Sequence, residues 1–509
     1  MSVNHIIIQA GGKGTRVERF TGNKPKALLS IHGKPLIMHI LDRFPEANIT
    51  VIADYKADVL EKYLNTFANR QLDIIRASEK GTASGIADAV ERIPDGEPFL
   101  LIWCDLYFDD TIIPPDVDVK SENHIGLSRD FVCRWSFSEG EVKEEPSSNE
   151  GIAGVFIFKD KQQISSIPTS GEFVRHLRDK GIRLTPFFLD GASEVGTYDV
   201  YMRAVDSQET GRPFNKVTIT ENVVVKEPRD SQGEKLAQDE QGWYKVAQSE
   251  RWPFVPEVKS YNPLIIERID GIPLWAASFS DEHKLELLNI IVRNLKTIHS
   301  TESVSIENVR ENNYEAIIGK TKRRLDSVAP VIPHIEEEEI IINGQKCINF
   351  YKQWDKLEAI ADKHLDASEY SLIHGDSTFS NTLYDELNDK LYFIDPRGYY
   401  GKVKLYGDPD YDWAKLYYSI VGNYDQFNRK NFALKFSPSS VNIEVHSQGW
   451  EKLEPDFFSK SGADPLKIRF LHAIIWLSLA SYAWDDYDSL CGAFYRGTYL
   501  MQKLYEETS

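Results

Sequence analysis

The chain has 509 residues, 41% of them hydrophobic and 12% aromatic, and its formal net charge is −19 at pH 7. A chain of this length is expected to form at least two domains with sizeable hydrophobic cores. The negative charge argues against nucleic acid or an anionic membrane as the main partner, so an anionic substrate would need a local cluster of lysine and arginine side chains.

The N-terminus combines an apolar strand with a glycine-rich turn. The strand HIIIQA at residues 5–10 runs into GGKGTR at residues 11–16. Glycines let backbone N–H groups approach phosphate oxygens closely, and a basic side chain adds charge. Neither the P-loop pattern nor GxGxxG is present. We therefore expect Gly11, Gly12 and Gly14 to form a phosphate-binding loop of a different kind.

Further segments of this first part support a nucleotide site. They are NKPKALLSIHGKPLI at 23–37, GTA at 81–83, the buried strand FLLIWCD at 99–105, the strand GIAGVFIF at 151–158 and the turn EVGT at 194–197. Together with GGKGTR they resemble the nucleotidyltransferases that make NDP-sugars, CDP-choline and related activated metabolites. The resemblance covers about residues 6–204 and implies a doubly wound α/β domain at residues 1–205.

The resemblance also implies roles for single residues. Arg16 and Lys26 would bind phosphates, and Gly81 would lie in the loop that contacts the nucleotide. Asp105 and Glu194 would hold Mg²⁺. In this chemistry a phosphate monoester attacks the α-phosphorus of an NTP and pyrophosphate leaves, so the site must neutralise two anions that repel each other.

Two positions depart from the family pattern. The second metal acid is Glu194 where the family has aspartate, and the family's EKP segment is replaced by EEP at residues 144–146. Lys143 lies two positions before Glu145, on the same face of an extended strand, and could substitute for the missing lysine. If it does not, the acceptor differs from a typical sugar 1-phosphate. A plain surface role for Lys143 and Glu194 stays open.

Residues 206–213 (DSQETGRP) are polar, contain glycine and proline, and predict a linker. Two β-branched strands are expected next, at 216–220 and 222–226. Apolar residues with helical spacing predict a helix at 281–299. These elements open a second domain at residues 214–509.

The segment HGDSTFSN…FIDPRG carries the chemistry of this second domain. Asp376 is followed five residues later by Asn381, and Asp395 ends an apolar run. Phosphoryl transfer needs such a set: one carboxylate accepts the proton of the attacking hydroxyl, while an amide and a second carboxylate hold Mg²⁺ against ATP. The alternative is that His374 and Asp376 cap a turn and that Asp395 is a solvated strand end.

The same segment resembles the aminoglycoside phosphotransferase/choline kinase family of small-molecule kinases. The resemblance implies an α+β, protein-kinase-like domain with two lobes, an N-lobe at 214–271 and a C-lobe at 272–509. It makes Asp376 the catalytic base, and Asn381 and Asp395 the ligands of Mg²⁺.

The N-lobe would hold ATP. Lys226 resembles the lysine that binds the α- and β-phosphates, with Glu240 as its acidic partner and Asp239 as the rival. PLIIERIDG at 263–271 resembles the hinge strand, whose backbone near Glu267 and Ile269 would pair with adenine.

Two sites in one chain predict a bifunctional enzyme. The kinase would phosphorylate a small hydroxylated metabolite with ATP, and the nucleotidyltransferase would couple the product to a second NTP (CTP, GTP or UTP). An NDP-activated sugar or a CDP-alcohol for surface polysaccharide would result, on family resemblance alone. The acceptor stays open between a sugar and an amino alcohol. Alternatively, only the kinase is active and the N-terminal domain is a ligand-binding or assembly module.

The remaining features predict a cytoplasmic protein. No signal peptide is recognised, and no window approaches the ~18 apolar residues of a membrane span. Partners are expected to be small molecules, and whether the chain forms a homo-oligomer stays open. The cysteines show no CxxC spacing and are expected to be reduced thiols: Cys104, Cys133, Cys347 and Cys491.

Overall fold

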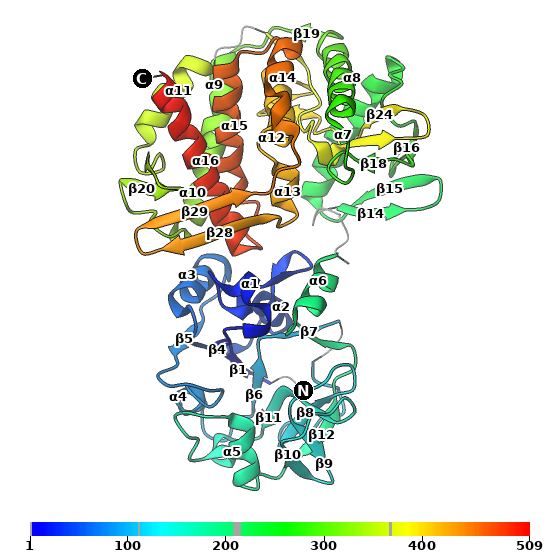
Figure 1. The fold of residues 1–509 in the computed structure, drawn as a ribbon. Coiled ribbons are helices and arrows are strands. Elements are labelled where there is room, and N and C mark those ends of the chain that lie inside the picture. The colour runs from blue at the N-terminus through cyan, green and yellow to red at the C-terminus, as the bar shows by residue number, and fades with distance from the viewer. Residues whose placement is uncertain (1–2, 110–111, 207–214, 366–368, 509) are drawn as a thin grey trace. The chain divides into compact units, whose positions relative to one another are not determined.

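The computed structural model describes residues 3–109, 112–206, 215–365 and 369–508 (Figure 1). Contacts divide the chain into two compact units. Unit 1 comprises Met1–Glu209 with Asp485–Asp488, and unit 2 comprises Thr210–Trp484 with Ser489–Ser509. The predicted linker lies outside the described residues, except for Asp206, which ends helix α6 (Tyr198–Asp206).

Unit 1 is built around one mixed sheet of nine strands with the main order β10-β9-β11-β6-β1-β4-β5. Strand β1 is central and pairs in parallel with β4 and β6, whereas β11 runs antiparallel to β6. The bounds are β1 His5–Gln9, β4 Asn48–Ala53, β5 Asp73–Arg76, β6 Phe99–Trp103, β8 His124–Ser128, β9 Ser136–Ser138, β10 Glu141–Lys143, β11 Gly151–Phe158 and β12 Thr185–Phe188. The strand predicted at 151–158 is confirmed by β11.

Both faces of this sheet are covered. Ile7 of β1 belongs to a core cluster with residues of α4 and α5, and its neighbours Ile6 and Ile8, which point to the opposite face, are also fully buried. Burial on both faces explains the continuous apolar runs of the central strands. The helices are α1 Glu18–Thr21, α2 Leu36–Arg43, α3 Ala57–Phe67, α4 Ile86–Glu91, α5 Phe173–Asp179 and α6. The Rossmann-like α/β fold expected for this part of the chain is confirmed.

Short elements complete unit 1. Strand β7 (Leu106–Phe108) pairs with β13 (Ala192–Glu194), which brings Glu194 opposite Leu106 and therefore next to Asp105 in space. Strand β2 (Ser30–Ile31) pairs with β3 (Lys34–Pro35) in the segment that follows Lys26. These small pairings position residues that are distant in sequence around the carboxyl end of β1.

Unit 2 begins with a four-stranded antiparallel sheet in the order β14-β15-β17-β16. Helix α7 (Ser231–Ser249) contacts β15 and β16 and buries Trp243, Tyr244 and Ala247. The strands are β14 Asn215–Ile219, β15 Val223–Pro228, β16 Val258–Tyr261 and β17 Leu264–Glu267. The two strands predicted at 216–220 and 222–226 correspond to β14 and β15.

The rest of unit 2 is mainly helical, with small sheets of two to four strands between the helices (Figure 1). The helices are α8 Asp281–His299, α9 Val309–Tyr314, α10 Lys320–Val328, α11 Trp354–His364, α12 Pro409–Ile420, α13 Tyr424–Asn428, α14 Glu454–Ser461, α15 Pro465–Leu479 and α16 Tyr487–Thr508, whose first two residues are assigned to unit 1. The strands nearest the predicted catalytic segment are β18 Ile272–Pro273, β22 Tyr370–Leu372, β23 Thr382–Asp385, β24 Lys390–Phe393 and β27 Tyr406–Gly407. Helix α8 spans the predicted residues 281–299.

The ends of these helices follow from their sequences. The Ser280 side chain accepts a hydrogen bond from the backbone N–H of His283 at the start of α8, and Asp408 accepts one from Asp410 at the start of α12. Acidic side chains in the first turn of α8 and basic ones in its last turn complement the helix dipole.

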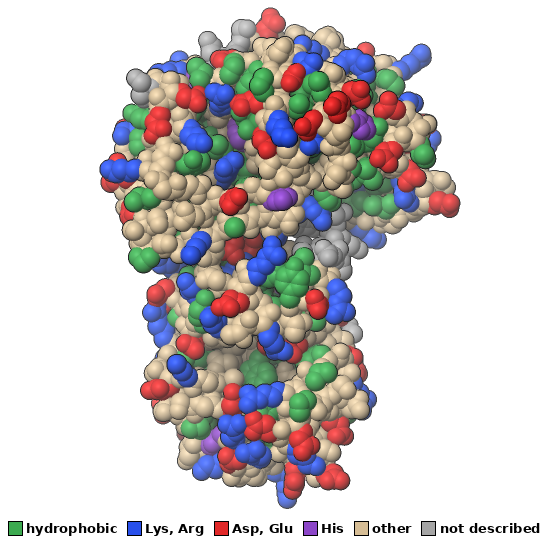
Figure 2. Space-filling view, viewed as in Figure 1, with side chains coloured by type: hydrophobic (Ala, Val, Ile, Leu, Met, Phe, Trp, Pro, Cys, Tyr) green, Lys and Arg blue, Asp and Glu red, His purple; other side chains and the backbone are tan. Residues whose placement is uncertain are grey.

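Charged side chains of both signs are interspersed over the visible surface, although the total charge is strongly negative (Figure 2). Within the part of the chain that the structure describes, no helix combines the length and the apolar character that crossing a bilayer requires.

Candidate active sites

The glycine turn of unit 1 follows β1 at the centre of the sheet, where the carboxyl ends of parallel strands form binding sites. Gly14 has a φ of 68°, a left-handed conformation that favours glycine. A Cβ on Gly11 would lie 2.7 Å from the Cβ of Asp54. The carbonyl of Gly12 accepts a hydrogen bond of 3.2 Å from the N–H of Lys26, which joins the two predicted phosphate-binding segments.

The loop of Gly81 lies at the same edge of the sheet. The Gln9 side chain at the end of β1 donates a hydrogen bond of 2.8 Å to the carbonyl of Thr82. Gly81 has a φ of 104°, and a Cβ there would lie 2.3 Å from the carbonyl oxygen of Gly171. Only glycine fits such a close backbone approach.

Four predicted residues form one ionic cluster. The Lys26 ammonium lies 2.6 Å from Asp105 Oδ2 and 3.9 Å from Glu194 Oε1. The same Glu194 oxygen lies 2.8 Å from Arg16 Nη2. The Lys26 side chain is only 7% exposed, whereas that of Arg16 is 62% exposed. Lys26 is therefore fixed between two carboxylates, and Arg16 faces solvent at the mouth of the cluster.

The donor set of this cluster fits Mg²⁺. Asp105 Oδ1 is buried and has no hydrogen-bond partner, so it is available as a hard oxygen ligand. The described residues contain no group of three or more histidine, cysteine, aspartate or glutamate side chains that could hold a metal ion alone. One or two carboxylates suffice for Mg²⁺ when substrate phosphates supply the other ligands. Asp105 and Glu194 could therefore hold it together with a bound nucleotide.

The expected position of Lys143 needs correction. Strand β10 ends at Lys143, so Lys143 and Glu145 do not share a strand face. The Lys143 ammonium lies 3.7 Å from a carboxylate oxygen of Glu139, and Glu144 is paired with Arg134 and Arg175. None of these contacts connects Lys143 to the Lys26 cluster.

The predicted ATP lysine of unit 2 also lies between two acids. Lys226 on β15 is 2.6 Å from Glu240 on α7 and is paired with Asp395. Burial alone would lower the pKa of Lys226, but the two carboxylates outweigh burial and raise it. The rival acid Asp239 is 2.9 Å from Lys404 instead. Of the two candidates on α7, Glu240 is the one that contacts Lys226.

The loop that carries Asp376 is fixed by a buried carboxylate. Asp412 of α12, which is fully buried, accepts hydrogen bonds of 2.8 and 2.7 Å from the N–H groups of His374 and Gly375. The same carboxylate lies 3.0 Å from His299 Nε2. Burial lowers the pKa of His374, so this side chain is neutral and structural.

The three predicted catalytic and metal residues lie around this loop. The Asn381 amide donates a hydrogen bond of 2.8 Å to the backbone carbonyl of Asp376. Asp395 follows β24 and has a φ of 57°, a left-handed conformation that aspartate tolerates better than most residues. Amide and carboxylate oxygens are suitable Mg²⁺ ligands, so Asn381 and Asp395 could hold the ion with the phosphates of ATP.

Two basic residues next to Asp376 were not predicted from the sequence. Lys415 of α12 lies 2.8 Å from Asp376 Oδ1. Arg397 donates its backbone N–H to the carbonyl of His374, and its Cβ would be 2.8 Å from a Cβ on Gly375. The position of Arg397 in the DPRG motif could have indicated that it lies near Asp376. Lys415 lies one helical turn from Asp412 on α12.

The predicted adenine contacts are only partly accessible in the sheet. The N–H of Glu267 donates a hydrogen bond of 2.8 Å to the carbonyl of Glu257. This donor is therefore already used within unit 2. Ile269 follows β17 and has a half-buried side chain.

Asp412→Asn is expected to lower the free energy of unfolding of unit 2 by about 3 kcal/mol. An amide cannot accept all three of the buried hydrogen bonds that the Asp412 carboxylate makes with the N–H groups of His374 and Gly375 and with His299 Nε2. Urea unfolding followed by tryptophan fluorescence measures the change, since only Trp103 and Trp135 of the ten tryptophans lie in unit 1. Asp362→Asn is the matched control, because Asp362 forms an exposed ion pair with Arg310. Equal effects of the two variants would contradict the prediction.

Sequence comparisons point to the same region of unit 1. A family model described as "MobA-like NTP transferase domain" matches residues 6–114. The chain is 28% identical over 245 residues to the Bifunctional protein GlmU of Methanocaldococcus jannaschii, covering 43% of this chain and 58% of that protein. It is 32% identical over 100 residues to the Bifunctional protein GlmU of Staphylococcus epidermidis, covering 20% of this chain and 22% of that protein. The chain thus spans 58–60% of the length of the first curated relatives it matches.

Among solved structures, the chain matches HddC from Yersinia pseudotuberculosis with 22% identity and a TM-score of 0.33, covering 40% of this chain and 98% of that chain. The CTP:phosphocholine cytidylyltransferase of Streptococcus pneumoniae has 17% identity and a TM-score of 0.31, covering 40% of this chain and 97% of that chain. The family match relates residues 6–114 of the chain to MobA-like NTP transferase domains.

Proposed function

We propose that the chain is a bifunctional enzyme. Unit 2 phosphorylates a hydroxyl group of a small metabolite with ATP. Unit 1 then couples the phosphate ester to a second NTP and releases pyrophosphate. The product is an NDP-activated sugar or a CDP-alcohol, of the kind used to decorate surface polysaccharides.

For unit 1, the proposal is supported by the family match and by the ionic cluster around Lys26. A buried ammonium held between two carboxylates, beside a glycine turn, can neutralise phosphate charge. Arg16 adds a second, exposed positive charge at the same place. Mg²⁺ held by Asp105 and Glu194 would stabilise negative charge on the reacting phosphates.

For unit 2, one observation carries the proposal. Lys226 contacts Glu240, 14 residues away, and Asp395, 169 residues away. A lysine on a strand, an acid on the next helix and an acid after the catalytic loop are the parts that hold ATP in protein-kinase-type phosphoryl transfer. Asp376 would orient the attacking hydroxyl and accept its proton. Asn381 and Asp395 would hold Mg²⁺.

A second candidate function keeps only the kinase active and makes unit 1 a ligand-binding or assembly module. The ion pair between Arg16 and Glu194 favours it, because a carboxylate paired with arginine is a weaker metal ligand. The segment EEP at residues 144–146 lacks the lysine of the family's EKP pattern, which also favours a unit 1 without catalytic activity.

One mixture tests the proposal. Purified full chain, Mg²⁺, ATP and the other NTPs are incubated with a panel of sugars, polyols, amino alcohols and their carboxylated and phosphorylated forms, and the products are identified by mass spectrometry. We expect a new NDP-linked mass, which identifies acceptor and nucleotide together. A phosphorylated acceptor without an NDP product would favour the second candidate. If neither a phosphorylated acceptor nor an NDP product forms, both candidate functions are contradicted.

A further inference from the structure

Unit 2 contains a small pocket with a strong excess of positive charge. Its volume is about 200 Å³. Six charged residues line it, and only one of them is acidic: Glu315, Lys320, Arg323, Arg324, Arg397 and Lys402. The pocket is smaller than the roughly 300–1,000 Å³ typical of drug-sized ligands, so it suits a small polar molecule.

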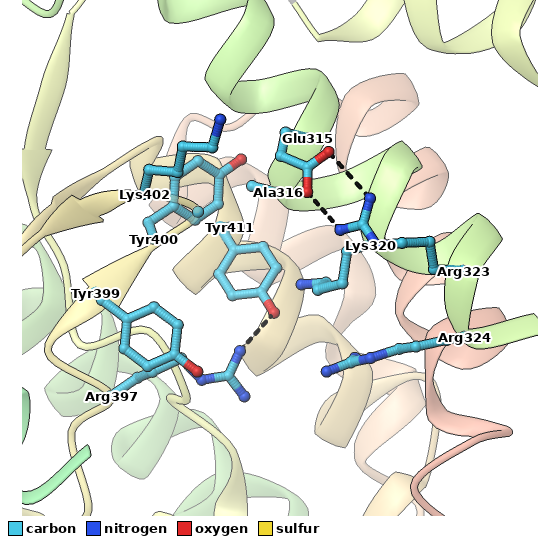
Figure 3. A pocket seen from close by; sticks show the side chains of 11 residues that line it. Glu315, Ala316, Lys320, Arg323, Arg324, Arg397, Tyr399, Tyr400, Lys402 and Tyr411 are labelled. Atoms are coloured by element: carbon cyan, nitrogen blue, oxygen red, sulfur yellow. Dashed lines mark hydrogen bonds and ion pairs between the residues drawn. The ribbon is translucent and has the colours of Figure 1, made fainter. Parts of the chain in front are cut away.

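Glu315 does not neutralise the interior of this pocket. It is paired with Arg323, on the side of the pocket away from the other guanidinium groups (Figure 3). Figure 3 shows the ends of Lys320, Arg324 and Arg397 pointing toward a common space beside the hydroxyl of Tyr411. We call Lys320, Arg324 and Arg397 the pocket cations.

None of the ion pairs found among the described residues involves a pocket cation. Arg324 donates hydrogen bonds of 2.6 Å to the hydroxyls of Ser478 and Tyr482, and Arg397 donates one of 3.3 Å to Tyr411. All of these acceptors are hydroxyl groups, and none is a carboxylate. Asp376 attracts Arg397 electrostatically, but three cations that form no ion pair with the described residues remain costly unless a further anion joins them.

The titration behaviour of the pocket agrees with this geometry. Burial is the main cause that lowers the pKa of Lys320 to about 8, and Arg397 and Arg324 add to it. Burial by itself would raise the pKa of Tyr411, yet Lys320 and other neighbouring cations lower it to about 7. The shift of Tyr411 indicates a positive potential in the pocket, which an anion would reduce.

The pocket adjoins the predicted catalytic base. Lys415 pairs with Asp376 and lies 6.0 Å from the ring centre of Tyr411, which lines the pocket. Arg397 contacts the backbone of the loop immediately before Asp376. A molecule held by the pocket cations would therefore lie next to the group that is proposed to activate a hydroxyl.

We propose that the pocket cations bind the phosphoryl acceptor through a carboxylate or phosphate group, so that the acceptor is an anionic hydroxyl compound and not a neutral sugar or an amino alcohol. This inference rests on the kinase function proposed above. Arginine forms paired hydrogen bonds to both kinds of anion, which makes two guanidinium groups a suitable clamp.

Binding is tested first, without catalysis. Isothermal titration of the full chain with inorganic phosphate, and separately with acetate, is carried out after the nucleotide site is saturated with Mg²⁺ and a non-hydrolysable ATP analogue. Lys320→Gln and Arg324→Gln are each expected to weaken binding about tenfold or more, because each removes a charge-assisted hydrogen bond. Lys322→Gln is the matched control on the same helix, since Lys322 pairs with Asp326. Equal affinity in all variants, or loss of binding when the nucleotide site is filled, would overturn the inference.

Turnover is tested with matched acceptors: glycerol and choline against glycerate and glycerol 3-phosphate, together with the acceptor that the mixture identifies. We expect anionic acceptors to be phosphorylated, with KM raised about tenfold or more by Lys320→Gln. Preference for glycerate or for glycerol 3-phosphate distinguishes the two anions. Phosphorylation of neutral or cationic acceptors, unaffected by Lys320→Gln and Arg324→Gln, would overturn the inference and leave the kinase function standing. No phosphorylation of any acceptor would overturn both.

Discussion

Asp376→Asn is expected to lower ATP-dependent phosphorylation of the acceptor by about 10²- to 10⁴-fold, the usual contribution of a general base. Asparagine has nearly the size of aspartate but cannot accept the proton of the attacking hydroxyl. The backbone of the loop is held by Asp412 through His374 and Gly375, so its shape does not depend on the Asp376 carboxylate. Release of ADP and mass spectrometry of the phosphorylated acceptor measure the change.

The ion pair with Lys415 makes a second variant necessary. Asp376 and Lys415 are 13% and 11% exposed, so Asp376→Asn leaves a largely buried ammonium without this carboxylate. The double variant Asp376→Asn with Lys415→Met removes both charges and should recover any lost thermal stability, but not the phosphorylation. Pyrophosphate release by unit 1 serves as the internal control. Phosphorylation at the wild-type rate in Asp376→Asn would contradict the kinase assignment.

The order of elements could be predicted from the sequence where local patterns are strong. Continuous apolar runs predicted the buried strands, and 3.6-residue spacing predicted α8 with the bounds that the structure has. Motifs at short spacing, such as Asp376 with Asn381, were visible because a single loop carries both residues.

Contacts between distant segments were harder to predict. The residues Lys226, Glu240 and Asp395 could be grouped only through a family resemblance, because nothing local connects residues so far apart in sequence. Lys415 was missed for the same reason: its partner precedes it by 39 positions and lies on a different element. The end of β10 at Lys143 was also not predicted, since strand ends depend on pairing with β9.

The pocket cations illustrate this limit. Lys320 and Arg324 are four residues apart on α10 and therefore lie on one face of the helix. In the sequence they stand in the basic run KTKRR, which resembles an exposed charged surface. Only the fold shows that two of these side chains turn inward to meet Arg397, whereas Lys322 and Arg323 pair with carboxylates. The negative net charge of the chain gives no hint of this local excess.

On the proposed role of Asp105 as a Mg²⁺ ligand, Asp105→Asn is expected to lower pyrophosphate release by unit 1 by about 10³-fold, because the variant would lose several kcal/mol of transition-state stabilisation. The buried Oδ1 of Asp105 has no hydrogen-bond partner, and Oδ2 positions Lys26. The amide keeps the size of the side chain but loses the negative charge that would bind Mg²⁺ and that pairs with Lys26. Release of pyrophosphate is measured with the acceptor phosphate supplied directly, so that the result does not depend on unit 2.

Two further variants separate metal binding from ion pairing. Asp42→Asn is the matched control, because Asp42 forms an exposed pair with Lys34, and should leave pyrophosphate release unchanged. Glu194→Gln should raise the Mg²⁺ concentration needed for half-maximal activity if Glu194 is a metal ligand. If Glu194 serves only to position Arg16, the Mg²⁺ dependence stays the same and Arg16→Gln reproduces the effect.

The outcome for Asp105→Asn decides between the two candidate functions. Loss of pyrophosphate release with phosphorylation intact would show two independent active sites in one chain. Pyrophosphate release that is absent from the wild type, or unchanged in Asp105→Asn, would mean that the Lys26 cluster does not perform nucleotidyl transfer. In that case the cluster would be an ion-paired binding surface, as the contact between Arg16 and Glu194 already permits. Loss of both activities would instead indicate that the variant is misfolded or that the two sites depend on each other, and thermal unfolding of the variant distinguishes these causes.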